Sequence, residues 1–207
     1  MSRKKSVQSR RFRGVTMPTS SHPDIRKVRR AGHEPTIHGN KLWKSSCLLI
    51  DYMKKHRPEH TGRVIDVGCG WGISGIWCAK KFDSKVTSVD ADPKVFPYLE
   101  ATAEINEVST EHQVSRFEKL SKRQLSQFDM LIAADICFWD ELVDPVTKLV
   151  NRAVKAGVKH ILIADPGRPT FTEMAERCVE KHYAEIIDYE VKKPIKADGY
   201  IMVLENA

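Results

Sequence analysis

Long apolar segments are missing from this 207-residue chain. No run approaches the roughly 18 to 20 apolar residues that a membrane-crossing helix needs, so we expect no membrane partner. The basic N-terminus is not followed by the apolar segment of a secretory signal, and it holds too few apolar residues for the amphipathic face of a mitochondrial transit peptide. A location in the cytoplasm is therefore predicted.

Paired cysteines are also missing. The chain has five cysteines, an odd number, and none of them forms a C-x-x-C pair. This pattern predicts neither a disulfide framework nor a zinc site, and no His/Cys cluster has the spacing of metal ligands. We therefore expect no metal and a reducing compartment, with most of the cysteines buried as small apolar side chains.

Positive charge is abundant but unevenly placed. Residues 1–30 hold ten Lys or Arg and one acid, whereas the remaining residues hold 24 of the 34 basic and 26 of the 27 acidic side chains, for a net charge of −2. We therefore predict a basic N-terminal arm without regular secondary structure over 1–38 and a folded domain over 39–207. The arm would either bind an acidic partner, including RNA, or serve as a solvated tail.

From residue 45 onward, short apolar segments alternate with amphipathic ones. Such alternation predicts a mostly parallel sheet with helices on both faces, and two consecutive strands at the end of the chain predict one antiparallel strand near the C-terminus. The fold class is thus α/β with seven strands. We expect strands at 63–68, 85–90, 112–118, 128–135, 160–165, 184–191 and 200–206, and helices at 45–56, 72–82, 97–106, 144–157 and 170–182.

The segment VIDVGCGWGISG, residues 64–75, joins the first predicted strand to a helix and can be read in two ways. Counted from Gly70 it fits G-x-G-x-x-G, the fingerprint of dinucleotide-binding proteins, with Asp90 about 20 residues further on. Counted from Asp66 it places an acid at the end of a buried strand, followed by Gly68, Gly70 and Gly72. The two interpretations predict different cofactors.

The charge of Asp66 favours the second interpretation. A buried carboxylate is costly unless a cation or a hydrogen-bond donor meets it, and it would repel a pyrophosphate. S-adenosylmethionine carries an ammonium and a sulfonium and has no phosphate. We therefore predict S-adenosylmethionine as the cofactor, with a nicotinamide-dependent oxidoreductase as the less favoured alternative.

The segments DVGCGWG (66–72), VTSVDADP (86–93) and FDMLIAADICFWDE (128–141) resemble the class I, or seven-β-strand, S-adenosylmethionine-dependent methyltransferases, which have a Rossmann-like fold. The resemblance implies that the loop approaches the methionine portion, that the acid ending the second strand binds both ribose hydroxyls, and that the residues after the third strand flank the adenine. The cofactor-binding residues that it implies are Asp66, Gly68, Cys69, Gly70, Asp90, Leu120 and Ala134, and the narrower resemblance described next adds Trp43.

A narrower resemblance is to the protein lysine methyltransferases of the electron-transfer-flavoprotein β-subunit type. It rests on LWKSS (42–46), on Asp135-Ile-Cys-Phe138 after the fourth strand and on ADPGRP (164–169) after the fifth. It implies a lysine side chain of a protein as methyl acceptor, with Asp135 and Phe138 as catalytic residues.

Other acceptors and functions remain open. The acceptor can also be a small molecule or RNA, although the D/N-P-P-F/Y motif of adenine-N6 methyltransferases is absent after the fourth strand. A scaffold without activity is a further alternative, which the presence of Asp90 and Asp135 opposes.

Overall fold

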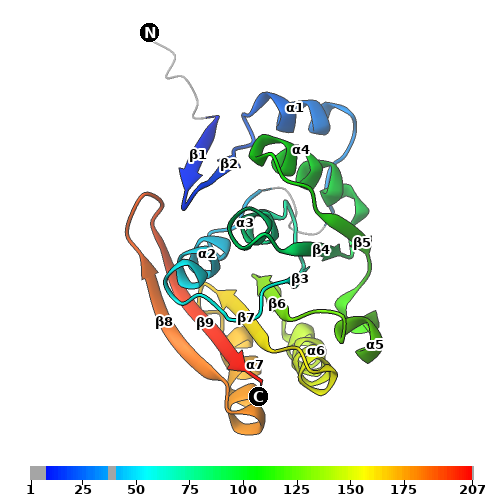
Figure 1. The fold of residues 1–207 in the computed structure, drawn as a ribbon. Coiled ribbons are helices and arrows are strands. Elements are labelled where there is room, and N and C mark those ends of the chain that lie inside the picture. The colour runs from blue at the N-terminus through cyan, green and yellow to red at the C-terminus, as the bar shows by residue number, and fades with distance from the viewer. Residues whose placement is uncertain (1–7, 37–40, 207) are drawn as a thin grey trace.

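The structure is a computed structural model that describes residues 8–36 and 41–206. Its centre is a seven-stranded sheet in the order β5-β4-β3-β6-β7-β9-β8 (Figure 1). β9 pairs antiparallel with both β7 and β8, and the other pairs of strands are parallel, so the predicted α/β fold is confirmed. The strands are β3 (Arg63–Val67), β4 (Lys85–Asp90), β5 (Glu111–Val114), β6 (Met130–Ala134), β7 (His160–Asp165), β8 (Glu185–Val191) and β9 (Ala197–Glu205).

Helices cover both faces of the sheet (Figure 1). Successive side chains of a strand point to opposite faces, so Val64 packs in the core under α2 and α3 whereas Ile65 packs in the core against α6 and α7. In the described part of the chain, no helix has the length and apolar character to cross a membrane. The helices are α2 (Ser45–Lys55), α3 (Ile73–Phe82) and α4 (Phe96–Asn106) on one face, α5 (Lys122–Leu125), α6 (Val143–Ala156) and α7 (Pro169–His182) on the other, and the short η1 (Pro93–Val95), η2 (Phe117–Lys119) and η3 (Asp140–Leu142).

The order of the strands creates a crevice at one edge of the sheet. The chain starts at β3 in the middle, builds outward through β4 to β5, and then returns to the other side of β3 as β6. At such a switch point the following helices diverge to opposite faces, which opens a crevice at the carboxyl ends of the strands. The strands that end there are β3, β4, β6 and β7.

The N-terminal segment is regular and packed, which corrects the prediction of an arm without secondary structure. Strands β1 (Ser9–Phe12) and β2 (Val15–Pro18) form a hairpin, and α1 (Pro23–Arg30) follows. Phe12, Val15 and Met17 are buried in the same core as α2 and α3, and Ile25 packs in a cluster with aromatic residues of the loop before α3 and of α4. The predicted boundary between residues 38 and 39 lies outside the described residues.

Polar contacts fix this hairpin to the helices beneath it. The amide N–H of Thr16 donates to Asn106 Oδ1 at 2.7 Å, and Asn106 Nδ2 donates back to the Thr16 carbonyl at 2.8 Å. Arg13, at the hairpin turn, forms an ion pair with the buried carboxylate of Asp51 on α2, and Trp77 Nε1 on α3 donates to the Arg13 carbonyl at 3.0 Å. The sequence did not reveal these contacts, because each joins residues 38 to 90 positions apart.

Another buried carboxylate joins the central strand to the helix that follows it. Asp66, the fourth residue of β3, is 3% exposed, and its Oδ2 accepts the N–H of Gly75 in the first turn of α3 at 3.0 Å. Burial and, to a smaller extent, the charge of Asp90 raise the pKa of Asp66 to about 7, against the lowering effect of this hydrogen bond. Folding therefore favours the protonated carboxyl group.

Replacing Asn106 by Ala should loosen the hairpin. The substitution leaves the N–H and the carbonyl of Thr16 without their partner, which we expect to cost about 2 to 3 kcal/mol of the free energy of unfolding in urea. Trypsin should also cut faster after Arg10, Arg11 and Arg13. Asn151→Ala, at a half-buried position on α6, is the control and should leave trypsin cleavage in the hairpin unchanged. Equal stability and equal protection in Asn106→Ala would contradict the fixed hairpin.

The raised pKa of Asp66 predicts a pH-dependent stability. The folded state binds a proton that the unfolded state has released, so the free energy of unfolding should fall as the pH rises from about 4 to about 7, by roughly 1.4 kcal/mol per pH unit. Asp66→Asn cannot titrate, so its stability relative to wild type should increase from pH 5 to pH 8 in urea unfolding. Asp51→Asn is the control. The pKa of Asp51 is lowered, so the difference in the free energy of unfolding between this variant and wild type should stay constant from about pH 5 to about pH 8. A constant difference for Asp66→Asn would refute the assignment.

Candidate functional site

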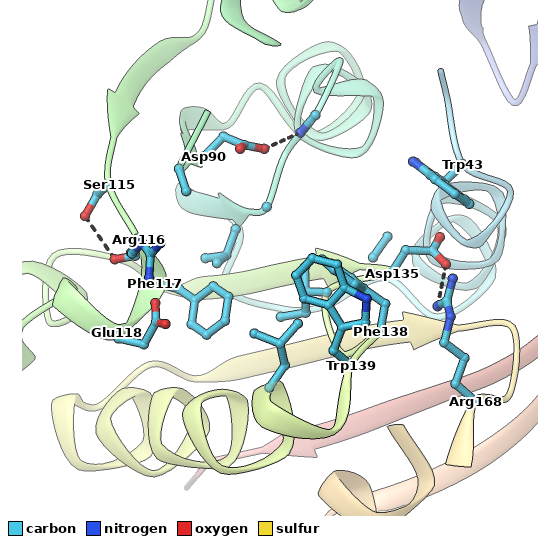
Figure 2. A pocket seen from close by; sticks show the side chains of 17 residues that line it. Trp43, Asp90, Ser115, Arg116, Phe117, Glu118, Asp135, Phe138, Trp139 and Arg168 are labelled. Atoms are coloured by element: carbon cyan, nitrogen blue, oxygen red, sulfur yellow. Dashed lines mark hydrogen bonds and ion pairs between the residues drawn. The ribbon is translucent and has the colours of Figure 1, made fainter. Parts of the chain in front are cut away.

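A cavity of about 420 Å³ lies at the crevice predicted by the strand order (Figure 2). Its volume is in the range of small-molecule and cofactor sites. The loop after β3, the ends of β4 and β6, the segment after β5 and the turn after β7 all contribute to its wall. It brings together most of the residues that the sequence singled out, namely Trp43, Gly68, Gly70, Asp90, Ala134, Asp135 and Phe138.

Asp90 fixes one end of the cavity. Its Oδ2 accepts the N–H of Gly70 at 3.0 Å, and its Oδ1 accepts the N–H of Asp92 at 3.0 Å. Burial raises the pKa of Asp90, and these two hydrogen bonds oppose that effect. An ionised carboxylate can accept about four hydrogen bonds, so both oxygens keep capacity for donors from a ligand, such as a pair of hydroxyls.

Four amide groups of the glycine-rich loop are paired within the protein. The N–H groups of Gly68 and Cys69 donate to the Val89 carbonyl at 2.8 and 3.1 Å, and that of Gly72 donates to the Cys69 carbonyl at 2.8 Å. The Gly70 amide donates to Asp90. A dinucleotide-binding loop needs such amides for the pyrophosphate. Here they are already paired, which argues against that class of ligand.

Gly70 leaves its side of the loop open to a ligand. Its φ is +52°, a conformation that favours glycine, and no atom lies within 4 Å of the place where a Cβ would stand. Because Gly70 also lines the cavity, a ligand can approach the backbone closely at this point.

Three of the predicted cofactor residues do not line the cavity. Asp66 is buried and its Oδ2 accepts the helix amide of Gly75, whereas the sequence predicted that its carboxylate meets the ligand. Leu120 is 1% exposed and belongs to the core with α5 and α6. Cys69 is half-buried and packs against the cluster of η1 and α4.

Residues 115–118 line the cavity where Leu120 had been expected. The sequence predicted a strand over 112–118, but β5 ends at Val114 and η2 begins at Phe117. The chain therefore turns toward the cavity earlier, and Phe117 provides an apolar wall (Figure 2). In the sequence, the signal for this wall was an aromatic residue, Phe117, just after a short polar strand.

A cluster of charged side chains forms the opposite end of the cavity (Figure 2). Arg168 Nη1 donates to Asp135 Oδ1 at 2.8 Å and to Asp165 Oδ2 at 2.6 Å. Asp165 Oδ1 also accepts the N–H groups of Gly167 and Arg168, at 2.9 and 2.8 Å. Burial raises the pKa of Asp165, while its hydrogen bonds and the charge of Arg168 oppose that effect. Arg168 thus bridges the two carboxylates: Asp165 fixes the position of the guanidinium, and the guanidinium binds Asp135.

Asp135 presents one unused oxygen. Its backbone has a φ of +59°, which is uncommon for a residue other than glycine, and its N–H donates to the Ala164 carbonyl at 2.9 Å. The side chain is 7% exposed. Within the described residues, Oδ2 of Asp135 has no hydrogen-bond partner, and Asp135 lines the cavity. A buried carboxylate oxygen without a partner is costly and points to a ligand group that donates to it.

Aromatic side chains surround this end. Phe138 and Trp139 meet edge to face, with ring centroids 4.7 Å apart and an angle of 71° between the rings. Trp139 is 53% exposed, so it stands at the rim. Trp43 lines the same cavity, and the ammonium of Lys41 lies 4.1 Å from its ring centroid. No group of three or more potential metal ligands occurs in residues 8–36 and 41–206.

Sequence comparison matches residues 34–135 to the family model of the methyltransferase small domain. The electron transfer flavoprotein β subunit lysine methyltransferase of Xenopus laevis is 26% identical over 140 residues, which are 67% of this chain and 54% of the relative. The chain thus spans about half the length of this relative. Ribosomal RNA small subunit methyltransferase C of a Marinomonas species is 32% identical over 79 residues, 36% of this chain and 22% of the relative.

Comparison with solved structures shows the fold. A SAM-dependent methyltransferase from Agrobacterium tumefaciens superposes with a TM-score of 0.62 at 12% identity, covering 84% of this chain and 70% of that one. The sheet, the loop and the sequence matches therefore show that this chain resembles the class I S-adenosylmethionine-dependent methyltransferases, with S-adenosylmethionine as cofactor, and within that class the electron-transfer-flavoprotein β-subunit lysine methyltransferases.

Proposed function

We propose that this chain transfers a methyl group from S-adenosylmethionine to the side-chain amine of a lysine in a protein. The observation that carries the proposal is the unpartnered Oδ2 of Asp135, buried at one end of the cavity and flanked by aromatic side chains. A carboxylate oxygen in this setting suits an amine that donates a hydrogen bond to it. The Xenopus relative acts, by its name, on a lysine of a protein.

The loop end of the cavity would hold the cofactor. In this assignment Asp90 receives the two ribose hydroxyls, the backbone at Gly68 and Gly70 lies along the methionine portion, and Phe117 covers the adenine. Trp43 and Ala134 complete the wall. When bound, S-adenosylmethionine supplies a methyl group on a positively charged sulfur, which is the electrophile of the reaction.

At the other end, Asp135 would orient the acceptor. A lysine must lose its proton before it can attack, which costs roughly 4 to 5 kcal/mol at pH 7 for an ordinary pKa near 10.4. A lone carboxylate next to the amine would increase this cost, because it favours the ammonium form. Arg168, 2.8 Å from Oδ1, offsets that charge, so that Asp135 can direct the amine without holding it protonated.

The aromatic residues would form the channel for the lysine. Phe138 lines the cavity beside Asp135, and Trp139 stands at the exposed rim. Aromatic faces attract a cationic ammonium and pack along the methylene stem. They also exclude water, which strengthens the orienting hydrogen bond.

The alternatives are less well supported. The paired loop amides oppose a nicotinamide-dependent oxidoreductase, and an exposed cavity with an unsatisfied carboxylate opposes an inactive scaffold. RNA or a small molecule as acceptor finds support in the match to the Marinomonas ribosomal RNA enzyme, which covers 36% of the chain. The location in the cytoplasm stays a prediction.

Substitutions at the two ends of the cavity should separate cofactor binding from transfer. Asp90→Ala should abolish S-adenosylmethionine binding in calorimetry, whereas Asp135→Asn should keep it and lower the turnover rate about 100-fold or more, because the amine loses its orientation. Arg168→Gln should also keep cofactor binding. It should shift the pH–rate profile to higher pH, because loss of the positive charge raises the pKa of the bound amine, and Arg168→Lys should restore part of that shift. An unshifted pH–rate profile in Arg168→Gln would contradict the role of Arg168 in lowering the pKa of the bound amine.

The acceptor class can be tested in a lysate of cells that lack this protein. Incubation with the purified chain and S-adenosylmethionine tritiated on the methyl group should label protein bands that resist RNase and are lost to protease. Acid hydrolysis should then release labelled methyl-lysine. Asp135→Asn is the control and should give about a hundredth of the label or less in the same time. Label that is lost to RNase, or that passes a dialysis membrane, would refute protein lysine as the acceptor.

A further inference from the structure

A second hollow, of about 450 Å³, lies beneath the turn of the N-terminal hairpin. Its wall includes Arg13, Lys54, Arg57 and Lys81, and no acidic residue from the described part of the chain lines it. It shares no lining residue with the cofactor cavity. The two sites lie toward opposite ends of α3, a helix of ten residues, which corresponds to about 15 Å.

Arg13 pairs with Asp51, whereas the other cations of this hollow have no carboxylate partner among the described residues. In the last turn of α2, Lys55 pairs with Asp51 at 2.8 Å. In the last turn of α3, Lys80 donates to the Asn106 carbonyl at 2.7 Å. Their neighbours Lys54 and Lys81 line the hollow instead and make no ion pair within residues 8–36 and 41–206.

Helix ends alone do not explain this arrangement. Lysines near a C-terminus interact favourably with the helix dipole, which accounts for Lys54 and Lys81. Arg57 lies beyond the end of α2, with its guanidinium 5.0 Å from the ring centroid of Phe82. Arg13 comes from the hairpin, where its backbone has a φ of +48°. Three separate segments thus bring positive charge to one hollow.

The floor of the hollow is apolar. Met53 and Trp77 are buried there, and Phe82 is half-buried and meets Trp77 edge to face at 4.9 Å. A small anion needs only the cations, whereas a nucleotide presents a phosphate together with the flat face of a base. Guanidinium groups beside an aromatic ring suit that combination.

Further cations are exposed on the hairpin and on the helix that follows it. Arg10 and Arg11 are exposed on β1, which leads into the turn above the hollow, and α1 exposes four further cations, Arg26, Lys27, Arg29 and Arg30. Because the hairpin is fixed to α2, α3 and α4, these charges sit on a folded surface. Binding would therefore not have to order a flexible arm, which lowers the entropic cost of association.

We infer that this hollow and the adjoining face of the hairpin bind the phosphate backbone of a nucleic acid. The inference is independent of the methyl acceptor, since the hollow is separate from the cofactor cavity. It would place the enzyme on a nucleic acid or a nucleoprotein while the cavity remains accessible. RNA and DNA share the phosphate chemistry, and the experiment below distinguishes them.

The test is fluorescence anisotropy of a labelled single-stranded RNA of about 20 nucleotides, titrated with the full chain at several salt concentrations. Wild type should bind, and its affinity should fall steeply with salt. Lys54→Gln/Arg57→Gln should weaken binding about tenfold at low salt. It should also reduce the slope of log K against log salt by about 1.4, since each contact with a single strand contributes about 0.7.

Lys122→Gln/Arg123→Gln, which removes one Lys and one Arg from the exposed surface of α5, is the matched control and should change binding much less. Equal thermal unfolding midpoints of the two variants will exclude a folding defect. A single-stranded DNA of the same sequence tells which nucleic acid is preferred. Equal losses in both variants, no binding by wild type, or equally effective competition by poly-glutamate would overturn the inference, the last result assigning the surface to an acidic protein.

Discussion

The carboxylate of Asp90 is the interaction on which the site depends. One of its oxygens holds the Gly70 amide and the other holds the Asp92 amide, so the glycine-rich loop and the end of β4 are fixed together. Asp92 in turn accepts the N–H and the hydroxyl of Thr36, at 2.6 and 2.9 Å. The cofactor end of the cavity and the N-terminal segment are thus parts of one connected structure.

Discrimination between cofactors follows from the same hydrogen bonds. The sequence suggested that Asp66 would select a phosphate-free ligand by direct repulsion, but this residue is not among those lining the cavity, and its Oδ2 accepts an amide in the first turn of α3. Pairing of the loop amides with Val89, Cys69 and Asp90 achieves the selection instead. The amides of Gly68, Cys69, Gly70 and Gly72 are not available to a phosphate, whereas hydroxyls find the carboxylate of Asp90. The predicted cofactor is unchanged, and its physical reason is different.

Local patterns predicted the sheet and its helices well, because apolar periodicity determines which segments are buried. They failed for residues 8–36, where Phe12, Val15, Met17 and Ile25 are too few and too widely spaced to show a period. The contacts that order this segment, with Asp51, Trp77 and Asn106, are distant in sequence. In the site, Asp135 and the turn containing Arg168 were each recognisable as motifs, but their 2.8 Å contact across 33 residues was not.

The central claim is that this loop accepts a nucleoside with an amino acid portion and rejects a dinucleotide. Isothermal titration calorimetry of the full chain with S-adenosylmethionine and with NADH, in the same buffer, tests it most directly. The account predicts saturable binding of S-adenosylmethionine at one site per chain and no detectable heat with NADH. Saturable NADH binding together with no heat from S-adenosylmethionine would contradict it.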